Sequence, residues 1–411
     1  MLDRFDKRQF RQYYRKIHPI LTEVRSEQMH IQPITIHIPQ ADLDDLQDRL
    51  KHTRWPDEVD DAGWDYGANL AYMHGLIAYW RTTFDWRAQE RTINTFANFR
   101  AEIDGVGIHF IYERGKGSNP IPLILTHGWP SSFAEMLKII PLLTDPKHYG
   151  ADPTDSFDVV VPSIPGFGFS DRPLQRGMTR SRVADLWVRL MEELGYPRFA
   201  AHANDIGAVI TCYIARDYPR RLLGYHTLMP HFPSPSFGTG TTTMSEAERR
   251  FVACNEQWER EEGGYNLIQE TKPQTLAYGL NDSPAGLAAW IIEKWRSWGA
   301  IDGHIERSFT MDELLTNVTI YWVTQTANSS SRSYYERIRD QRRFGLNPHI
   351  AVPTGVALTM ETVQRAPREW VERVYTDIRH WTEFDHGGHF LATEEPALLA
   401  ADIRTFFRKL R

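Results

Sequence analysis

The apolar positions of residues 101–229 follow the alternation of strands and helices that is typical of a parallel α/β sheet. The run Phe157–Pro162 is short, apolar and β-branched, as expected for a strand that is buried on both faces. Apolar residues recur at helical spacing between Val183 and Leu194, and Gly195 then ends the predicted helix. The same patterns predict further strands at Ile108–Glu113, Ile121–Thr126, Arg198–Ala203 and Leu222–Met229.

The segments on either side of this block have different patterns. Residues 31–100 begin with the alternating, strand-like run Pro33–Pro39 and continue with an expected helix over Ala41–Leu50. The stretch Trp64–Phe99 is aromatic and helical in pattern. Residues 230–346 are also largely helical and aromatic, after a stretch rich in Gly, Thr, Ser and Pro.

The α/β pattern returns after the helical block. Strands are predicted at Ile350–Thr359 and Ile378–Phe384, and a closing helix at Pro396–Leu410. A helical block inserted into one parallel sheet suggests a lid over the carboxyl ends of the strands, where open α/β sheets bind ligands. We therefore expect an α/β fold with a mostly parallel central sheet and helices on both faces. Its parts are an N-terminal extension at 1–30, a segment at 31–100, a core at 101–229 and 347–411, and a lid at 230–346.

The composition narrows the classes of function. The chain has 411 residues and a formal net charge of −6, which argues against a nucleic-acid binder, because such proteins usually carry a basic face. Its two cysteines, Cys212 and Cys254, form neither a disulfide framework nor a metal-ligand cluster, as in a reducing compartment. We find no apolar run of membrane-helix length and no signal-peptide core, so the sequence predicts a soluble, cytoplasmic protein.

The most informative polar residue is Asp205, on a predicted sharp turn between a strand and a helix. Small residues flank it at Ala203 and Gly207, and a tight strand-to-helix turn needs that smallness. Taken alone, Asp205 is well explained as a helix N-cap, a position that aspartate favours. On such a turn in a hydrolase, its carboxylate would attack substrate and become an ester.

Three further elements fall at the same edge of the predicted sheet. His389 lies on a Gly-rich loop after the last strand, and Glu361 follows the strand before it, in the order nucleophile, acid, histidine. The acid would orient the imidazole and stabilise its charged form. The turn His127-Gly128-Trp129-Pro130 offers backbone N–H groups to an oxyanion. A structural histidine, a surface glutamate and an ordinary turn explain each one singly, but their order together indicates an α/β-hydrolase site.

Several short motifs extend this picture. They are His127-Gly128-Trp129-Pro130, Pro165–Ser170, Gly387-Gly388-His389-Phe390 and, ahead of the core, Thr53–Asp57. With these motifs the chain resembles an epoxide hydrolase of the microsomal and juvenile-hormone type, within the α/β-hydrolase fold. The resemblance covers roughly residues 31–411 and implies that residues 31–100 are the family's N-terminal meander, which wraps the core.

The resemblance also assigns roles to aromatic residues of the lid. The family uses two lid tyrosines to polarise the epoxide oxygen, and by motif position these are Tyr265 and Tyr334. Tyr335 is adjacent to Tyr334 and is an alternative. The expected reaction opens an epoxide to a vicinal diol through an aspartyl ester, which a water activated by His389 then hydrolyses. No metal and no cofactor is needed.

The oxyanion loop and the elbow carry one match and one departure. The resemblance assigns oxyanion and substrate contacts to Trp129 and Ile206, together with His127 and Gly128. The family's elbow usually reads Gly-Gly-Asp-Trp-Gly, whereas Asn204 precedes and Ile206 follows the aspartate in this chain. The N–H of Ile206 can still serve the oxyanion, but the wall of the pocket changes.

The acid is the second departure. In the family it falls at the position of Thr362, which cannot orient a histidine as a carboxylate would. Glu361, one residue earlier, is the substitute that we predict. Asp377 and Asp385 are further alternatives, both less natural in chain position.

Two other functions remain open from the sequence. A haloalkane dehalogenase shares an aspartate nucleophile on this fold but commonly has a tryptophan where Ile206 stands. A catalytically inactive member of the fold would only bind a ligand. We expect a small-molecule epoxide, bulky and apolar or aromatic, and neither nucleic acid nor membrane as partner; homodimer formation is left open. The substrate expectation rests on the lid residues Trp258, Trp290, Trp295, Trp298, Tyr321 and Trp322.

Overall fold

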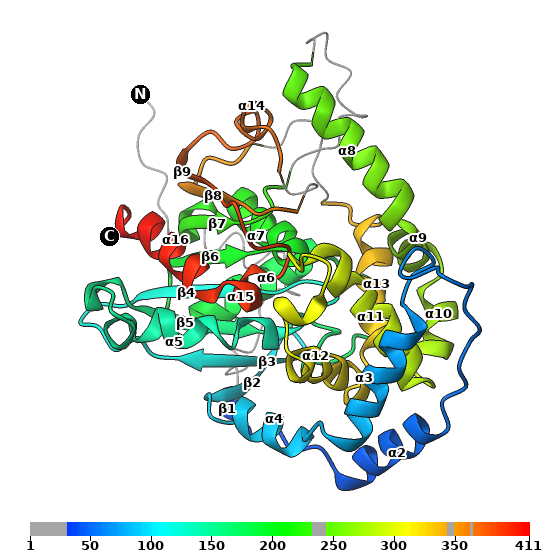
Figure 1. Ribbon diagram of the computed structural model, residues 1–411. Helices are drawn as coiled ribbons and strands as arrows, with labels where there is room; N and C mark the ends of the chain where they lie inside the picture. Colours follow the sequence, from blue (N-terminus) through cyan, green and yellow to red (C-terminus); the bar gives the residue numbers. More distant parts are fainter. Residues whose placement is uncertain (1–30, 232–243, 343–348, 362–364) are drawn as a thin grey trace, which may run out of the picture.

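The computed structural model describes residues 31–231, 244–342, 349–361 and 365–411. Its strands are β1 Ile31–Pro33, β2 Asn98–Ile103, β3 Val106–Glu113, β4 Ile121–Thr126, β5 Phe157–Pro162, β6 Phe199–Ala203, β7 Leu222–Thr227, β8 Thr354–Leu358 and β9 Ile378–Glu383. They form one sheet in the order β1-β2-β3-β5-β4-β6-β7-β8-β9 (Figure 1). Strands β1, β2, β3 and β5 pair antiparallel, and β5, β4, β6, β7, β8 and β9 are parallel. The predicted mostly parallel sheet is confirmed.

Helices cover both faces of this sheet. On one face lie α5 (Ile139–Thr144) and α16 (Pro396–Arg408), and on the other α6 (Arg180–Glu193) and α7 (Asp205–Asp217). The side chains of β4 show why: Leu123 and Leu125 join the apolar cluster of α16, whereas Ile124 joins the cluster of α6. Successive residues of a strand point to opposite faces, so an apolar run supplies both layers.

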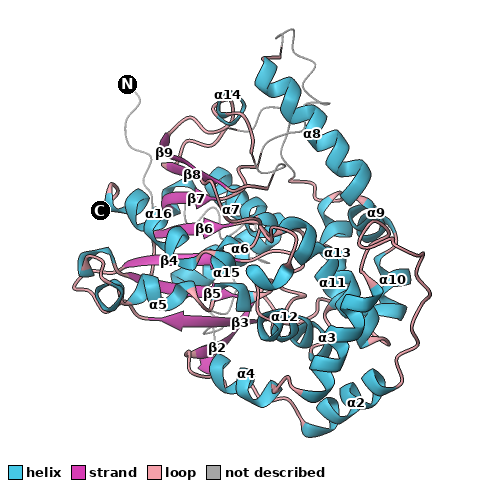
Figure 2. Ribbon diagram, in the orientation of Figure 1, coloured by secondary structure: helices cyan, strands magenta, loops and turns pink. Residues whose placement is uncertain are grey.

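A third group of helices lies at the carboxyl ends of the parallel strands (Figure 2). We call α8 to α13 the cap helices; they are α8 Glu246–Glu262, α9 Gly264–Thr271, α10 Pro273–Leu280, α11 Pro284–Trp298, α12 Met311–Val323 and α13 Ala327–Arg337. The N-terminal helices α2 Gln40–Lys51, α3 Leu70–Thr82 and α4 Trp86–Ile93 pack against α11 and α12. Two short helices, α14 Arg368–Val371 and α15 Leu391–Glu394, flank β9. The cap helices thus stand in the segment for which the sequence predicts helices, and the edge of the sheet beneath them can hold a site.

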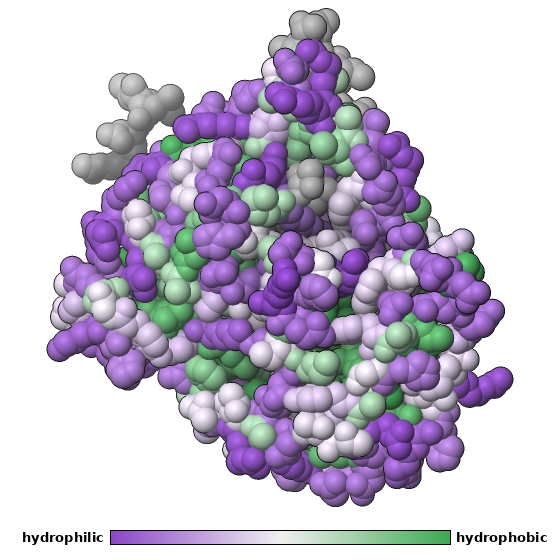
Figure 3. Space-filling view, viewed as in Figure 1, coloured by the Kyte–Doolittle hydropathy of each residue, from purple (hydrophilic) through white to green (hydrophobic). Residues whose placement is uncertain are grey.

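The surface in Figure 3 is mostly hydrophilic, with apolar residues scattered between polar ones. The large apolar side chains therefore lie mainly in the two clusters that sandwich the sheet. No helix in the described ranges is long and apolar enough to cross a membrane. The cytoplasmic location stays a prediction.

The run Pro33–Pro39 departs from the predicted strand. Strand β1 ends at Pro33, and the last backbone contact of the run with β2 is the hydrogen bond from the Ile34 N–H to the oxygen of Asn98 at 2.9 Å. The alternation itself is real, because Ile36 and Ile38 are buried and His37 between them is exposed. The N–H of Ile36 binds Asn94 Oδ1 at 2.9 Å, and that of Ile38 binds Glu90 Oε2 at 2.8 Å. Side chains at the end of α4 therefore take the place of a neighbouring strand.

The stretch predicted as helical over Trp64–Phe99 also ends early. Helix α4 stops at Ile93, and β2 begins at Asn98, where Phe99 and Arg100 pair with Phe110 and His109 of β3. The aromatic character of this stretch does not distinguish helix from strand, so the β2–β3 pairing, which is a tertiary contact, decides it.

Candidate active site

Asp205 occupies a strained turn between β6 and α7. Its φ is 49°, in the left-handed region that residues with a side chain rarely adopt. Two glycines allow the turn to form. A methyl group at Gly207 would overlap the backbone oxygen of Thr126, and one at Gly128 would overlap the Asp205 side chain. Backbone strain of this kind persists where the surrounding packing determines it, and it is common at functional sites.

The loop after β4 approaches the Asp205 carboxylate directly. The N–H of Trp129 donates a hydrogen bond to Asp205 Oδ1 at 2.8 Å. The cap holds this loop from above, since Asn317 Nδ2 donates to the oxygen of Pro130 and the Tyr321 hydroxyl donates to the oxygen of Ser131, each at 2.8 Å. The Trp129 N–H is therefore a fixed donor beside the carboxylate.

The imidazole of His127 lies inside this loop. It is completely buried; its Nε2 accepts from the N–H of Ile164 at 3.2 Å, and its Nδ1 lies 3.1 Å from the oxygen of Gly128. Burial lowers the pKa of His127 to about 4, so the ring is neutral at physiological pH. The ring thus joins the loop after β4 to the loop after β5, and contact with substrate stays a prediction for this residue.

His389 and Glu361 meet at the same edge of the sheet. His389 Nδ1 lies 2.7 Å from Glu361 Oε2, and both side chains are less than 10% exposed, at 6% and 7%. The alternatives for the acid lie elsewhere: Asp377 binds Arg379, and Asp385 is 95% exposed beside His386. Thr362, the family's position for the acid, lies outside the described residues. Glu361 is therefore the described carboxylate that reaches the imidazole of His389.

Charge strongly affects this imidazole. Burial disfavours the protonated ring, but the charge and hydrogen bond of Glu361, together with the charge of Asp205, outweigh burial and raise the pKa of His389 to about 9. At neutral pH the resting site consequently holds a protonated imidazole that is paired with the carboxylate of Glu361.

Four aromatic rings, which we call the aromatic box, pack against one another beside these groups. Tyr265 stacks on Trp129 with ring centroids 4.8 Å apart and an interplanar angle of 6°. Tyr334 meets Trp129 edge-on at 6.0 Å and Tyr265 edge-on at 5.9 Å, and Trp298 closes the box 5.1 Å from the His389 ring. Burial is the main cause that raises the pKa of both phenols, and the charge of Asp205 adds to it, so each keeps its proton and can donate a hydrogen bond.

The structure also separates Tyr334 from its neighbour. The half-buried ring of Tyr335 lies 3.4 Å beneath the guanidinium of Arg339, whereas Tyr334 is 2% exposed and faces Trp129. Of the two, Tyr334 is the tyrosine that shares the aromatic box with Tyr265.

Comparison with known proteins identifies the family to which this chain belongs. Residues 31–136 match the family model described as the epoxide hydrolase N terminus, and residues 121–253 match the alpha/beta hydrolase fold. The chain is 36% identical to Epoxide hydrolase 1 of Sus scrofa, over 93% of this chain and 89% of that protein. A Stigmatella aurantiaca (strain DW4/3-1) protein that has also been given an epoxide hydrolase name is 44% identical, over 93% of this chain and 86% of that protein. The chain belongs to the epoxide hydrolase family.

A solved structure agrees. The crystal structure of juvenile hormone epoxide hydrolase from the silkworm Bombyx mori matches with a TM-score of 0.84 and 30% identity, covering 93% of this chain and 95% of that one. The resemblance and the α/β-hydrolase fold predicted from the sequence are confirmed. The protein is a hydrolase, and its family acts on epoxides.

Contacts that the sequence did not reveal hold the histidine loop of this epoxide hydrolase. Asn204 Nδ2 donates to the oxygen of His389 at 2.6 Å, and the His389 N–H donates to the oxygen of Trp298 at 2.9 Å. The carboxylate of Glu394 accepts from three backbone N–H groups, those of Ala300, Gly388 and Phe390. Asn204, which departs from the family's elbow, thus holds the histidine loop in place through this hydrogen bond. The sequence shows that Asn204 departs from the family's elbow, but it does not identify the hydrogen-bond partner of Asn204.

The lid aromatics divide into two groups. Trp258 and Trp298 contact the ring of Tyr265, at 6.4 and 5.2 Å. Trp295 instead stacks on Phe390 at 4.2 Å, and the ring of Trp322 receives the guanidinium of Arg49. The aromatic wall of the candidate site is therefore smaller than the sequence suggested.

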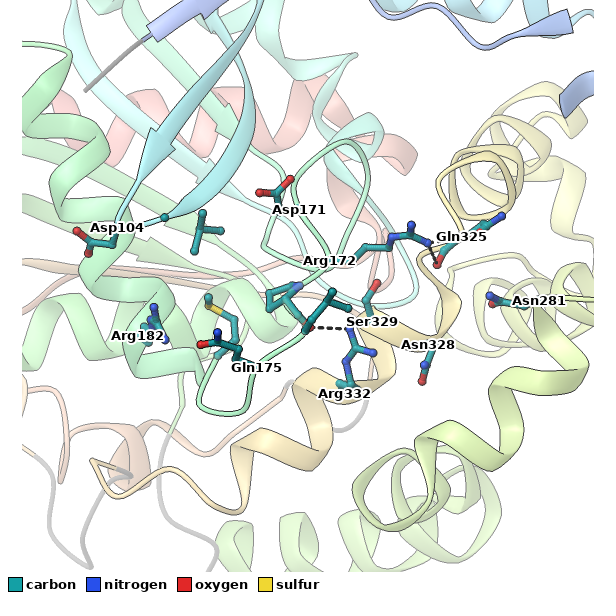
Figure 4. Close-up of a pocket in the computed structure, with 15 residues that line it drawn as sticks. Asp104, Asp171, Arg172, Gln175, Arg182, Asn281, Gln325, Asn328, Ser329 and Arg332 are labelled. Carbon is teal, nitrogen blue, oxygen red and sulfur yellow. Dashed lines mark hydrogen bonds between the residues drawn. The ribbon is translucent and has the colours of Figure 1, made fainter. Parts of the chain in front are cut away.

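A cavity of about 900 Å³ lies away from these residues, at the seam between core and cap (Figure 4). Asp205, His389, Tyr265 and Tyr334 are absent from its lining, which includes Asp171, Arg182 and Asn281. Across the seam, Arg332 donates to the oxygen of Pro173 at 2.8 Å. The candidate site is therefore identified by the chemistry of its residues, and this cavity is separate from it.

Proposed function

We propose that this epoxide hydrolase opens its substrate through a covalent ester on Asp205. The carboxylate oxygen Oδ2 attacks one epoxide carbon, and the bond from that carbon to the ring oxygen breaks. Tyr265 and Tyr334 donate hydrogen bonds to the ring oxygen, and one phenol transfers its proton to the departing alkoxide. Because that charge develops only in the transition state, these donors lower the barrier more than they strengthen binding.

Ester hydrolysis follows, with His389 as the base that activates water and Glu361 as the carboxylate that stabilises the charged imidazole. The neutral imidazole takes a proton from water, and the hydroxide attacks the ester carbonyl carbon of Asp205. The carbonyl oxygen is Oδ1, the atom that already accepts from the Trp129 N–H, and we assign the Ile206 N–H as its second donor. Collapse of this intermediate breaks the bond from the carbonyl carbon to the ester oxygen, and that oxygen takes the proton from the imidazolium and leaves as the second hydroxyl of the diol. The remaining carboxyl proton of Asp205 returns to the phenolate, which restores the carboxylate and the phenol.

The observation that carries the proposal is that Asp205 accepts a hydrogen bond from the Trp129 N–H, while its chain neighbour Asn204 binds the backbone of His389, whose imidazole is paired with a buried carboxylate. Formation of the ester also removes the negative charge of Asp205, one of the causes that raise the pKa of His389. The imidazole can therefore lose its proton more easily once the ester exists. The same step that creates the intermediate thus favours the base that hydrolyses it.

An isotope experiment tests the ester. In a single turnover in heavy-oxygen water, the first diol should carry its new oxygen from unlabelled Asp205. Heavy oxygen in the first-turnover diol would refute the ester route. His389→Ala should trap the ester, seen as the mass of protein plus substrate.

We further propose that the substrate carries a bulky apolar or aromatic group. The support is the box of Trp129, Tyr265, Tyr334 and Trp298, whose rings stack or meet edge-on. A panel of aromatic and short aliphatic epoxides, with chiral analysis of the diols, compares kcat/KM directly. Equal kcat/KM across the panel would refute the aromatic preference. Assays for halide release from chloroalkanes belong in the same panel, since an aspartate ester also forms in haloalkane dehalogenases.

A further inference from the structure

Arg180 is an unusual residue for its position. It is the first residue of α6, where the positive end of the helix dipole disfavours a cation. It is only 5% exposed, and its Nε has no hydrogen-bond partner in the described part of the chain. Burial of a cation without a carboxylate is costly. An interaction of Arg180 must therefore offset the free-energy cost of burying its charge at this end of the helix.

Arg180 interacts with the ring of Tyr334. The guanidinium carbon of Arg180 lies 5.5 Å from the centre of the Tyr334 ring. A second guanidinium, that of Arg337, lies 5.7 Å from the same ring, and it is paired with Glu270. Burial and the charge of Arg180 lower the pKa of Arg337 to about 10. Two cations therefore converge on one phenol, and Arg180 is the one without a described counter-ion.

The other tyrosine of the box is placed differently. One face of Tyr265 is stacked on Trp129, and the ammonium of Lys294 lies 5.5 Å from the ring centre. That ammonium forms ion pairs with both Glu262 and Glu293, at 2.6 and 2.8 Å, so its field on the ring is largely cancelled. The rings of Tyr334 and Tyr265 consequently lie in different electrostatic surroundings, with a net positive charge beside Tyr334.

We propose that Arg180 is a positioning residue that makes Tyr334, rather than Tyr265, the principal proton donor to the epoxide oxygen. This inference rests on the proposed function. A nearby unpaired cation stabilises the negative charge that builds on a phenol as it gives up its proton. The effect is strong here because the ring and the guanidinium are both shielded from water. No contact between Arg180 and substrate is required.

A double-mutant cycle tests this coupling. The rates of ester formation and ester hydrolysis are measured in single turnovers of styrene oxide for Arg180→Met, Tyr334→Phe and the double variant. Arg180→Met should slow ester formation about tenfold in the parent protein, as expected for removal of a cation beside a desolvated ring. In the Tyr334→Phe background the same substitution should change that rate by less than about twofold. Ester hydrolysis should not change in either background.

The charge itself is tested with Arg180→Lys, which should keep most of the rate of ester formation. Arg182→Met is the matched control, because Arg182 lies on the same helix and lines the seam cavity instead. Melting temperatures are compared for all variants. Should Arg180→Met not fold, Arg180→Lys and Arg180→Gln carry the same comparison.

An equal loss of ester formation in both backgrounds, or an equal loss in both chemical steps, would overturn the role of Arg180. Tyr265→Phe provides the complementary result, because Arg180→Met should keep its tenfold effect in that background. Absence of any ester in the parent protein would instead refute the proposed function. The two failures are therefore distinguishable.

Discussion

His389 and Glu361 are 28 residues apart in the chain, yet His389 Nδ1 lies 2.7 Å from Glu361 Oε2 inside the folded protein. The contact forms because β8 and β9 are neighbours in the sheet and their carboxyl ends deliver both residues to one edge. The pair explains how a chain with threonine at the family's acid position can still charge and orient its histidine.

Glu361→Gln should slow ester hydrolysis on the order of a hundredfold and slow ester formation much less, so that the ester accumulates. The amide keeps the shape of the side chain but removes the charge that stabilises the imidazolium. Rapid quench and intact-protein mass spectrometry measure the two steps. Asp385→Asn is the matched control and should behave as the parent protein, because Asp385 is exposed and bound only to His386 among the described residues. Equal slowing of both steps by Glu361→Gln would show that Glu361 acts on something other than the base.

The rate of ester hydrolysis should rise with pH and then level off. The base must be neutral, and the pKa of His389 in the resting protein is raised to about 9 by Glu361 and Asp205. In the ester the charge of Asp205 is absent, so the inflection should lie below that value. Glu361→Gln removes a second cause of the raised pKa and should move the inflection lower still. Single-turnover profiles of both proteins measure it, and an inflection that rises in the variant would contradict this electrostatic account.

Gly128→Ala should reduce ester formation by more than about a hundredfold, since its methyl group would displace the Asp205 carboxylate. Gly75→Ala is the matched control. Gly75 is exposed within α3 and has open space around it, so alanine should stabilise the fold by about 0.5–1 kcal/mol without changing either rate. Chemical denaturation and single-turnover kinetics measure both variants. Unchanged ester formation in Gly128→Ala would mean that the elbow can shift without loss.

Asn204→Ala should lower the rate of ester hydrolysis about tenfold and the free energy of unfolding by about 1–3 kcal/mol, because the buried oxygen of His389 loses a donor. Asn94→Ala offers a comparison of the same residue type. Asn94 binds the backbone of Ile36 through both side-chain atoms, far along the sheet, so its loss should cost similar stability and leave the chemistry unchanged. If both variants hydrolyse the ester at the parent rate, Asn204 does not position the histidine.

Several parts of the fold could be predicted because they depend on local pattern. The ranges Ile121–Thr126 and Phe157–Pro162 agree with β4 and β5 at both ends, since a strand buried on two faces needs an uninterrupted apolar run. The run Pro33–Pro39 could not be resolved in this way. Its alternation reports burial of Ile36 and Ile38, but these two residues donate to side chains in α4 and at its C-cap, and no local pattern identifies those partners.

The sequence by itself determined the order and spacing of the groups: an aspartate with a small residue two positions away on either side, a glutamate after one strand and a histidine after the next. These are properties of the chain, because turn geometry and strand burial restrict the residue types that fit. Only the tertiary structure decided which carboxylate contacts His389 and that Asn204 holds the histidine loop. It also decided that Arg180 lies against the ring of Tyr334, whereas Lys294, which is paired with glutamates, lies against Tyr265. The reason is that these contacts join segments that are distant in the chain: the loops after β8 and β9, the turn after β6 and the histidine loop, and the core and the cap. The energy of each contact depends on distance and burial, which only the packed molecule defines.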